Sequence, residues 1–307
     1  MLKYNRGDNM SDYMNKLTTK QLKELEEELV AIYGDTTRTV IKQLKKVLAD
    51  LETGLEGVER LNALNKKERL EKLLKRLMED IHNTNLESVK KINDNIINTF
   101  INNQQYGAFL VDHATGLSMD WALYDRKIIK EILLGNSNPF YHLALDNFKD
   151  KDLIYRALKR ELAQGIVLGE SIPKIAKRIQ NIINSNRYDS IRIARTETGR
   201  AENAGRLNSF KQAEKEGIRL KKQWSSVADA RTRDSHLLLN TESVGLDERF
   251  SNGLDQPCGD GPAKEVINCR CTMTVEFVDY EKTKKEMELD EELKRMTFEE
   301  WKERQGL

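Results

Sequence analysis

The chain has 307 residues, 38% of them apolar and 33% charged, which is enough for one large or two modest domains and excludes a small protein held together by disulfides. Its 51 basic and 50 acidic residues give a net charge of +1, which excludes the overall basic character of a histone-like nucleic-acid binder. The sequence has neither an apolar run of about 18 residues nor the apolar stretch of a secretion signal, so we expect a cytoplasmic chain without a membrane anchor.

Apolar residues recur at three- and four-residue spacing through the first hundred residues, which is typical of amphipathic helices. The four stripes run from Leu22 to Ile32, Val40 to Leu51, Leu70 to Ile81 and Val89 to Ile96. Gly34, Gly54, Gly57 and the polar stretch 82–85 predict breaks between them, and Thr84 with Glu87 has the spacing of a capping box. We therefore expect several helices folded on one another in an N-terminal region over 1–149. One continuous coiled coil is the alternative.

Residues 102–120 lose this spacing and predict a loop, followed by a helix over 121–134 and a second break at 135–139. Amphipathic helices are expected over 150–164 and 171–184, with a third from about 186 to 216 that ends at Gly217.

Beyond Gly217 the pattern changes to strand-like alternation over 219–227 and 271–278, so a short sheet is expected between about 219 and 278. The polar residues between these strands form a longer loop than is usual unless a ligand, a metal or a function organises it. The predicted fold class is mainly α with a small α+β C-terminal domain over 150–280, followed by a charged helical tail over 281–307.

Three short blocks follow one another in the C-terminal half: ARTETGRAENAGR over 194–206, WSSVADARTRDSH over 224–236 and EVINCRCTM over 265–273. In this order and spacing they resemble the Mu F-type head-morphogenesis family, the minor capsid proteins of tailed bacteriophages. The resemblance covers residues 150–280, and the helical N-terminal half matches the family only in kind. The signature residues are Arg195, Glu197, Asn203, Trp224, Arg231 and Asn268.

This resemblance implies a minor head protein in the capsid interior of the virion, assembled in the host cytoplasm. It implies the portal protein and other capsid or scaffold proteins as partners, and a role in head assembly and in DNA packaging or ejection. Because such work is structural, no catalytic residue is expected. Since only a short segment follows the last predicted strand, we expect no toxin or nuclease domain of the kind that some relatives carry.

The three cysteines, Cys258, Cys269 and Cys271, are an odd number for a disulfide framework and favour a metal site or buried reduced thiols. Cys269 and Cys271 lie two residues apart at the start of a predicted strand, so their thiols point to the same face. The resemblance implies the motif Thr-Cys-x-x-Cys at 232–236. This chain has Arg233 in place of the first cysteine and His236 in place of the second. His236 is then a third ligand for a structural zinc ion, beside Cys269 and Cys271, and Cys258 or Asp234 would have to be the fourth. The alternative is that His236 bonds a loop carbonyl and the cysteines are small buried hydrophobes.

The segment 194–206 alternates charged with small residues, so its Arg–Glu pairs are expected to form a structural network against a closely packed neighbour. The rival interpretation is an enzyme, either a metal-dependent hydrolase or an ADP-ribosyltransferase-like protein, centred on His236, Cys269, Cys271 and Arg195. The helical position of Arg195 and the lack of an HExxH motif count against it.

Residues 187–233 contain 12 basic and 6 acidic side chains, a local excess in a chain that is otherwise neutral. Such a stripe favours weak, sequence-independent contact with phage double-stranded DNA. The candidate DNA-binding residues are Arg187, Arg192, Arg219, Lys221 and Lys222. The same mixture of charges is also typical of a solvated helix face with paired side chains.

Overall fold

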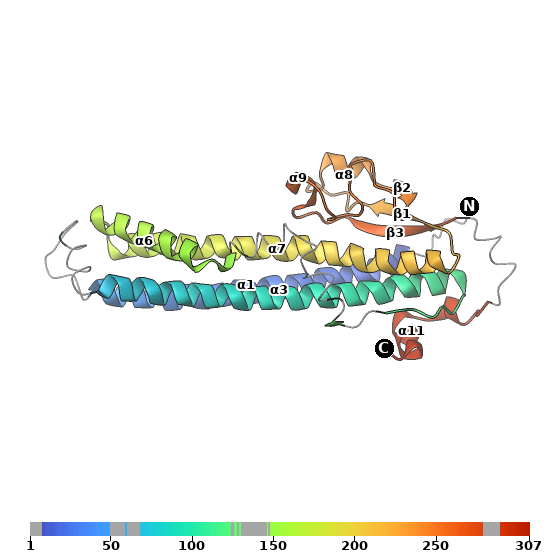
Figure 1. The fold of residues 1–307 in the computed structure, drawn as a ribbon, viewed down its shortest axis with the longest axis horizontal. Coiled ribbons are helices and arrows are strands. Elements are labelled where there is room, and N and C mark those ends of the chain that lie inside the picture. The colour runs from blue at the N-terminus through green and yellow to red at the C-terminus, as the bar shows by residue number, and fades with distance from the viewer. Residues whose placement is uncertain are drawn as a thin grey trace. The chain divides into compact units, whose positions relative to one another are not determined.

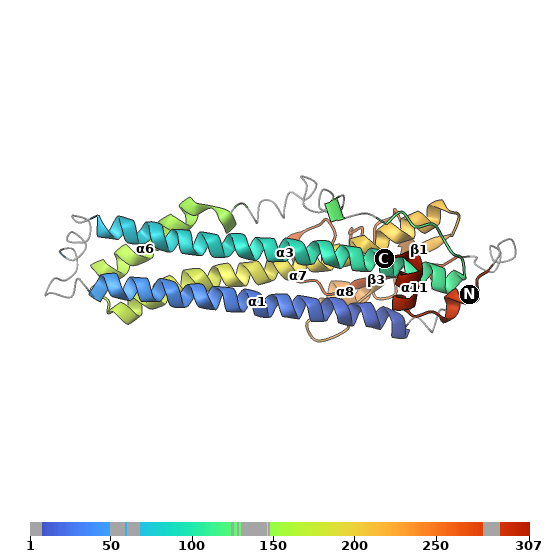
Figure 2. The same ribbon diagram turned by 90° about the horizontal axis from the view of Figure 1, so that it is seen from below.

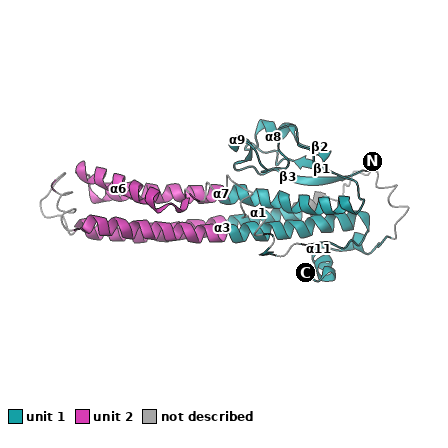
Figure 3. Cartoon of the chain, in the orientation of Figure 1, with its two compact units in different colours: residues 1–23, 93–137, 194–307 teal, residues 24–92, 138–193 magenta. Residues whose placement is uncertain are grey.

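The computed structural model describes residues 8–49, 59, 68–123, 126–127, 129, 146, 148–278 and 289–307. These residues form a mainly helical protein with a small antiparallel sheet, as the sequence predicts (Figure 1). The chain divides into two compact units: unit 1 comprises residues 1–23, 93–137 and 194–307, and unit 2 comprises residues 24–92 and 138–193 (Figure 3). Three of the described helices, α1 (Asp8–Ala49), α3 (Arg69–Thr115) and α7 (Ile172–Lys215), contribute to both units. The domain boundaries expected at 149 and 280 stay a prediction.

Unit 2 contains parts of α1, α3 and α7 together with α6 (Lys151–Val167). Asp150 caps α6, since its side chain accepts hydrogen bonds from the backbone N–H groups of Asp152 and Leu153. Each helix buries the apolar face that the sequence pattern predicts. The fully buried side chains include Leu29 and Leu44 of α1, Leu74 and Ile81 of α3, Leu158 and Leu162 of α6, and Ile179 and Ile183 of α7.

Two expected helix breaks in unit 2 are wrong: α1 continues through Gly34, and α3 continues through residues 82–85. The polar residues at these two places bond to each other instead of ending their helices. The Tyr33 hydroxyl donates to Asn85 Oδ1 at 2.9 Å, and the hydroxyl oxygens of Thr36 and Thr84 lie 2.6 Å apart. Because these four polar side chains bond across the helix pair, the stretches that look like loops in the sequence stay helical.

The expected capping box at Thr84 is also wrong, since Thr84 lies inside α3 and its hydroxyl donates to the backbone oxygen of Asp80 at 2.9 Å. The loop predicted over 102–120 begins only at Gly116, whose φ of +73° ends α3. The two helices expected over 171–184 and 186–216 form the single helix α7. The breaks expected at Gly54 and Gly57, and most of the helix expected over 121–134, lie outside the described residues.

The sheet belongs to unit 1 and consists of β1 (Leu220–Ser225), β2 (Ser243–Gly245) and β3 (Thr272–Phe277) in the order β2-β1-β3. Both pairings are antiparallel, and Trp224 of β1 lies opposite Met273 of β3. The sequence predicts β1 and β3 but not β2. The sheet lies against α7 (Figure 1). At this contact the Arg206 guanidinium donates to the backbone oxygen of Met273 at 3.1 Å.

Two aromatic side chains of the C-terminal segment, Phe298 and Trp301, anchor this part of unit 1 on α3. It contains the 3-10 helix η1 (Leu293–Arg295) and the helix α11 (Phe298–Gln305), which begins with a capping box between Thr297 and Glu300. Helix α11 lies beside α3 (Figure 2). Trp301 is fully buried and its indole N–H donates to Asp112 Oδ2 at 2.9 Å, while the Trp121 indole donates to the same oxygen at 3.0 Å. No helix among the described residues is long and apolar enough to cross a bilayer.

Candidate metal centre

The loop between β1 and β3 carries two short helices, α8 (Asp234–Leu238) and α9 (Ala263–Val266), around a small apolar core. This core consists of Trp224, Leu239, Phe250, Leu254, Cys258, Val266, Cys269 and Cys271. The loop is therefore folded over its own buried side chains, and His236 of α8 is 1% exposed within it.

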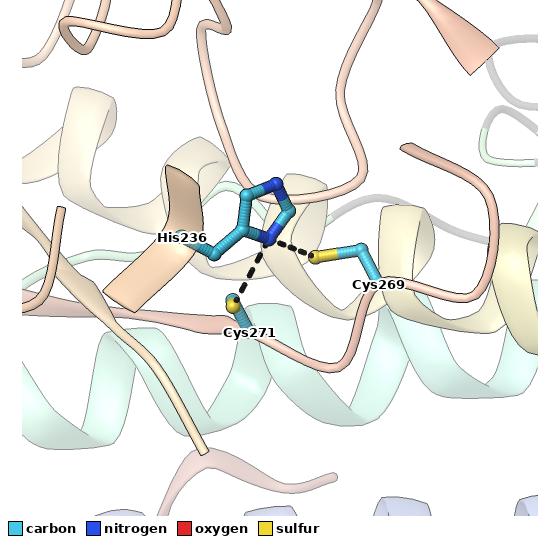
Figure 4. A group of neighbouring side chains, drawn as sticks. All are labelled: His236, Cys269 and Cys271. Atoms are coloured by element: carbon cyan, nitrogen blue, oxygen red, sulfur yellow. Dashed lines mark hydrogen bonds between the residues drawn. The ribbon is translucent and has the colours of Figure 1, made fainter. Parts of the chain in front are cut away.

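His236, Cys269 and Cys271 come together as the sequence predicts (Figure 4). Their ligand atoms all lie within 4.8 Å of one another, and each sulfur lies 3.5 Å from His236 Nδ1. Two thiols and an imidazole nitrogen form a donor set that Zn²⁺ prefers. The residues therefore fit a metal ion of this type by their chemistry.

The electrostatics of the cluster favour a deprotonated sulfur at Cys269. Interactions with Cys258 and Cys271, and then with His236, hold the pKa of Cys269 well below its usual range. The pKa values of Cys258 and Cys271 are raised, first by the interaction of each with Cys269 and then by burial. Burial lowers the pKa of His236, but the interactions with Cys269 and Glu265 outweigh it, so that this pKa is raised. A thiolate is the form of cysteine that binds metals.

Cys258 lies beside the cluster, with its thiol donating to the backbone oxygen of Cys269 at 3.3 Å. Its backbone has a φ of +59°, and it sits against Gly199 of α7, where an added Cβ would lie 2.7 Å from its sulfur. The other residue considered as a fourth ligand, Asp234, is exposed at the start of α8.

Helix α7 holds the loop through backbone atoms of the loop as well as through loop side chains such as Asp260, which pairs with Arg200 at 2.5 Å. Asn203 is fully buried and its amide donates to the backbone oxygen of Cys271 at 3.3 Å. The backbone N–H of Asn268, which has a φ of +55°, donates to the Thr196 hydroxyl at 3.1 Å. These two bonds fix the chain on both sides of Cys269. They are a structural reason for the signature residues Asn203 and Asn268.

The remaining signature residues lie in different environments. Trp224 is fully buried against His236, with their rings edge to face at 5.2 Å. Glu197 pairs with Arg200 of the same helix at 3.2 Å, whereas Arg195 is exposed on α7 and Arg231 is exposed on the loop.

Within the segment 194–206, the structure singles out Arg206 as the most connected buried cation described in unit 1. It is 1% exposed and donates to Asn103 Oδ1 at 3.0 Å, to Asn15 Oδ1 at 2.6 Å and to Glu202 Oε1 at 2.8 Å, in addition to the backbone oxygen of Met273. Arg206 therefore ties together α1, α3, α7 and β3. This is the structural network that the Arg–Glu alternation predicts.

The candidate DNA-binding residues do not form one set. Lys222 is 1% exposed, and its ammonium donates to the backbone oxygen of Leu246 at 2.8 Å, so it is not available to a phosphate. Lys221 and Arg219 are exposed in unit 1, whereas Arg187 and Arg192 lie in unit 2. Arg192 pairs with Asp189 at 2.8 Å, and the Arg187 guanidinium lies over the Tyr188 ring.

Residues 156–274 match the model of a family described as phage Mu protein F like protein. This segment contains most of α6, all of α7, the cluster and nearly all of the sheet. Over these residues the chain is similar to the phage Mu F-like family. The Mu F-like domain therefore includes both the helix that holds the loop and the candidate ligands.

Two curated proteins are similar to this chain. The minor head protein GP7 of Bacillus phage SPP1 is 23% identical over 273 residues, which cover 87% of this chain and 85% of that protein. An NAD(+)–arginine ADP-ribosyltransferase, EFV, of Enterococcus faecalis is 32% identical over 161 residues, 50% of this chain, but the match spans only 32% of that protein. No solved structure matches the chain significantly.

Proposed function

We propose that this chain is a minor head protein of a tailed bacteriophage, located in the capsid interior and assembled in the host cytoplasm. The observation that carries this proposal is the alignment with the SPP1 minor head protein, which extends over 87% of this chain and 85% of that one. It includes the helical N-terminal part, which lies ahead of the Mu F-like domain. In this proposal the protein takes part in head assembly near the portal and in DNA packaging or ejection, with portal, capsid or scaffold proteins as partners.

Co-expression with the portal protein of the same genome tests this proposal. We expect the two proteins to elute together in size-exclusion chromatography, and the chain to be found in purified virions by mass spectrometry. Two separate peaks together with virions that lack the chain would contradict it.

The cluster is proposed to hold a structural zinc ion that clamps the loop between β1 and β3, with Cys258 completing the set. Its burial beside Cys269 supports this, whereas the exposure of Asp234 does not favour that residue. We expect purified protein to contain close to one zinc per chain and the His236→Ala variant to lose both the metal and thermal stability. Cys258→Ser should weaken zinc binding, whereas Asp234→Asn, the matched control, should not. Full zinc content in His236→Ala would contradict the site.

Contact with DNA is proposed as weak and independent of sequence, through Arg187, Arg192, Arg219 and Lys221. We expect wild-type protein to bind duplex DNA with an affinity that falls as salt rises, and a variant with Arg187, Arg192 and Arg219 neutralised to have a smaller salt slope. The control Arg38→Ala, at an exposed α1 position, should leave the slope unchanged. Binding with no dependence on salt, or none at low salt, would contradict this proposal.

An enzymatic function is the second candidate, and the match to the ADP-ribosyltransferase is the observation that favours it. We propose a structural protein instead, because that match leaves two thirds of the enzyme without a counterpart here and because Arg195 is exposed on a helix. Incubation with NAD⁺ and an arginine acceptor distinguishes the two. Transfer of ADP-ribose by wild-type protein that is lost in Arg195→Ala would favour the enzyme.

A further inference from the structure

Glu265 lies next to the candidate ligands but is not one of them. It belongs to α9, is mostly buried, and its Oε2 lies 3.0 Å from His236 Nε2. The Ser235 hydroxyl donates to the same carboxylate oxygen at 3.1 Å. Ser235, the residue directly before His236, therefore helps to hold the Glu265 carboxylate in place.

The two nitrogens of His236 thus have different partners. Nδ1 faces both sulfurs at 3.5 Å, and Nε2 faces the Glu265 carboxylate. A neutral imidazole carries one N–H, and the nitrogen without it is the one that can bind a metal. A carboxylate accepts a hydrogen bond but does not donate one, so Glu265 favours the form of His236 with the proton on Nε2. The lone pair is then on Nδ1, directed toward the thiols.

We propose that Glu265 is a positioning residue that makes His236 an Nδ1 ligand of the metal centre. This inference rests on the proposed zinc site. The Trp224 ring packs edge to face against the His236 imidazole, with 5.2 Å between the ring centroids, and so supports the orientation in which Nδ1 faces the sulfurs. Glu265 is not itself a ligand in this arrangement, because it contacts the nitrogen that points away from the sulfurs.

A carboxylate behind a ligating histidine fixes the ring and makes its free nitrogen more basic, and loss of such a partner costs about 10- to 100-fold in metal affinity. Glu265→Ala is therefore expected to weaken zinc binding by about that factor. Glu265→Gln keeps an oxygen that accepts the Nε2 hydrogen but loses the charge, so its loss should be smaller. Lys264→Ala, an exposed neighbour on α9, is the matched control and should change the affinity by less than about twofold.

Two measurements on the full chain test the inference: zinc affinity by competition with a chromophoric chelator, and the nitrogen chemical shifts of His236 in zinc-loaded, ¹⁵N-labelled protein. The chain has only four histidines, so the His236 signals are assigned by their loss in His236→Ala. We expect a proton on Nε2 and a metal-shifted Nδ1 in wild type and in Glu265→Gln. Glu265→Ala should lose this pattern, which a merely structural role for Glu265 would leave unchanged.

Wild-type affinity and an unchanged nitrogen pattern in Glu265→Ala would overturn the inference while leaving the metal centre intact. A wild-type protein that takes up no zinc would overturn the metal centre, and the inference with it. If Glu265→Ala does not fold, Glu265→Gln decides: weaker binding with the proton kept on Nε2 supports the inference, and wild-type affinity overturns it.

Discussion

Replacement of Arg206 by methionine is expected to destabilise unit 1 strongly. Methionine fills a similar apolar space but donates no hydrogen bond, so the acceptors at Asn15, Asn103, Glu202 and Met273 all lose their donor. All four acceptors face a guanidinium that is 1% exposed, so water cannot readily replace it.

The magnitude follows mainly from Glu202, whose side chain is 9% exposed and pairs with Arg206 at 2.8 Å. Breaking a buried ion pair by removal of one partner costs about 3–5 kcal/mol, because a buried charge is left without compensation. Each neutral acceptor left unsatisfied adds about 1 kcal/mol or more, partly offset by relaxation of the two asparagine side chains. We expect the free energy of unfolding of unit 1 to fall by about 4 kcal/mol.

Tryptophan fluorescence in a denaturant titration reports this change from unit 1, because all three tryptophans of the chain, Trp121, Trp224 and Trp301, lie in that unit. Arg195→Met, at an exposed position of the same helix, is the control and should cost less than about 0.5 kcal/mol. A loss below about 1 kcal/mol in Arg206→Met would refute the view that this network holds the unit together.

The loss should also depend on pH. Burial raises the pKa of Glu202 above its ordinary value of 4.5, and the charge of Arg206 opposes this rise. Without Arg206 the pKa rises further. A carboxyl group whose pKa is raised by folding stabilises the protein below its unfolded pKa and loses that contribution as the pH rises. Arg206→Met should therefore be less destabilised at pH 5 than at pH 8, and Glu202→Gln in the same chain should remove the difference.

Two further predictions concern Asp112 and the close contact at Gly205. Burial raises the pKa of Asp112 to about 6, so the stability of wild type relative to Asp112→Asn should fall by on the order of 2–3 kcal/mol between pH 4 and 7, as followed by tryptophan fluorescence in denaturant at each pH. A constant difference across this range would contradict it. Gly205→Ala places a Cβ 2.5 Å from the backbone oxygen of Phe100 and should cost about 1–3 kcal/mol in thermal or chemical unfolding. Gly34→Ala, whose nearest neighbour is the flexible end of Arg38 at 3.7 Å, should instead stabilise the protein by up to about 1 kcal/mol.

The sequence predicts the type of most elements but not where the helices end. Apolar spacing predicts the buried faces of the long helices, because it depends only on which residues avoid water. The breaks fail at Gly34 and at residues 82–85, because a polar stretch ends a helix only when its side chains find no partner. Here Thr36 bonds to Thr84, a contact between positions far apart in the chain that no local pattern predicts.

In the candidate site, too, the sequence predicts some features and not others. The grouping of His236, Cys269 and Cys271 is predictable from residue chemistry and order along the chain. Glu265 is not, because an acidic residue within a charged sequence carries no signal until the loop folds. The burial of Lys222 had a signal that was missed: in a strand, alternate residues share a face, and Lys222 lies between the buried Leu220 and Trp224.

Helix α7 contacts the loop through backbone groups and through side chains of the loop. The backbone oxygen of Cys271 and the backbone N–H of Asn268 are groups that every amino acid other than proline offers. The contacts through loop side chains use acidic residues, since Arg200 pairs with Asp260 and Lys211 pairs with Asp247. None of these contacts uses the side chain of His236, Cys269 or Cys271, so a histidine can replace a cysteine among these three positions with the same four contacts kept. Cys258 differs, because its sulfur lies against Gly199 of the helix and a larger side chain on either element would need a change on the other.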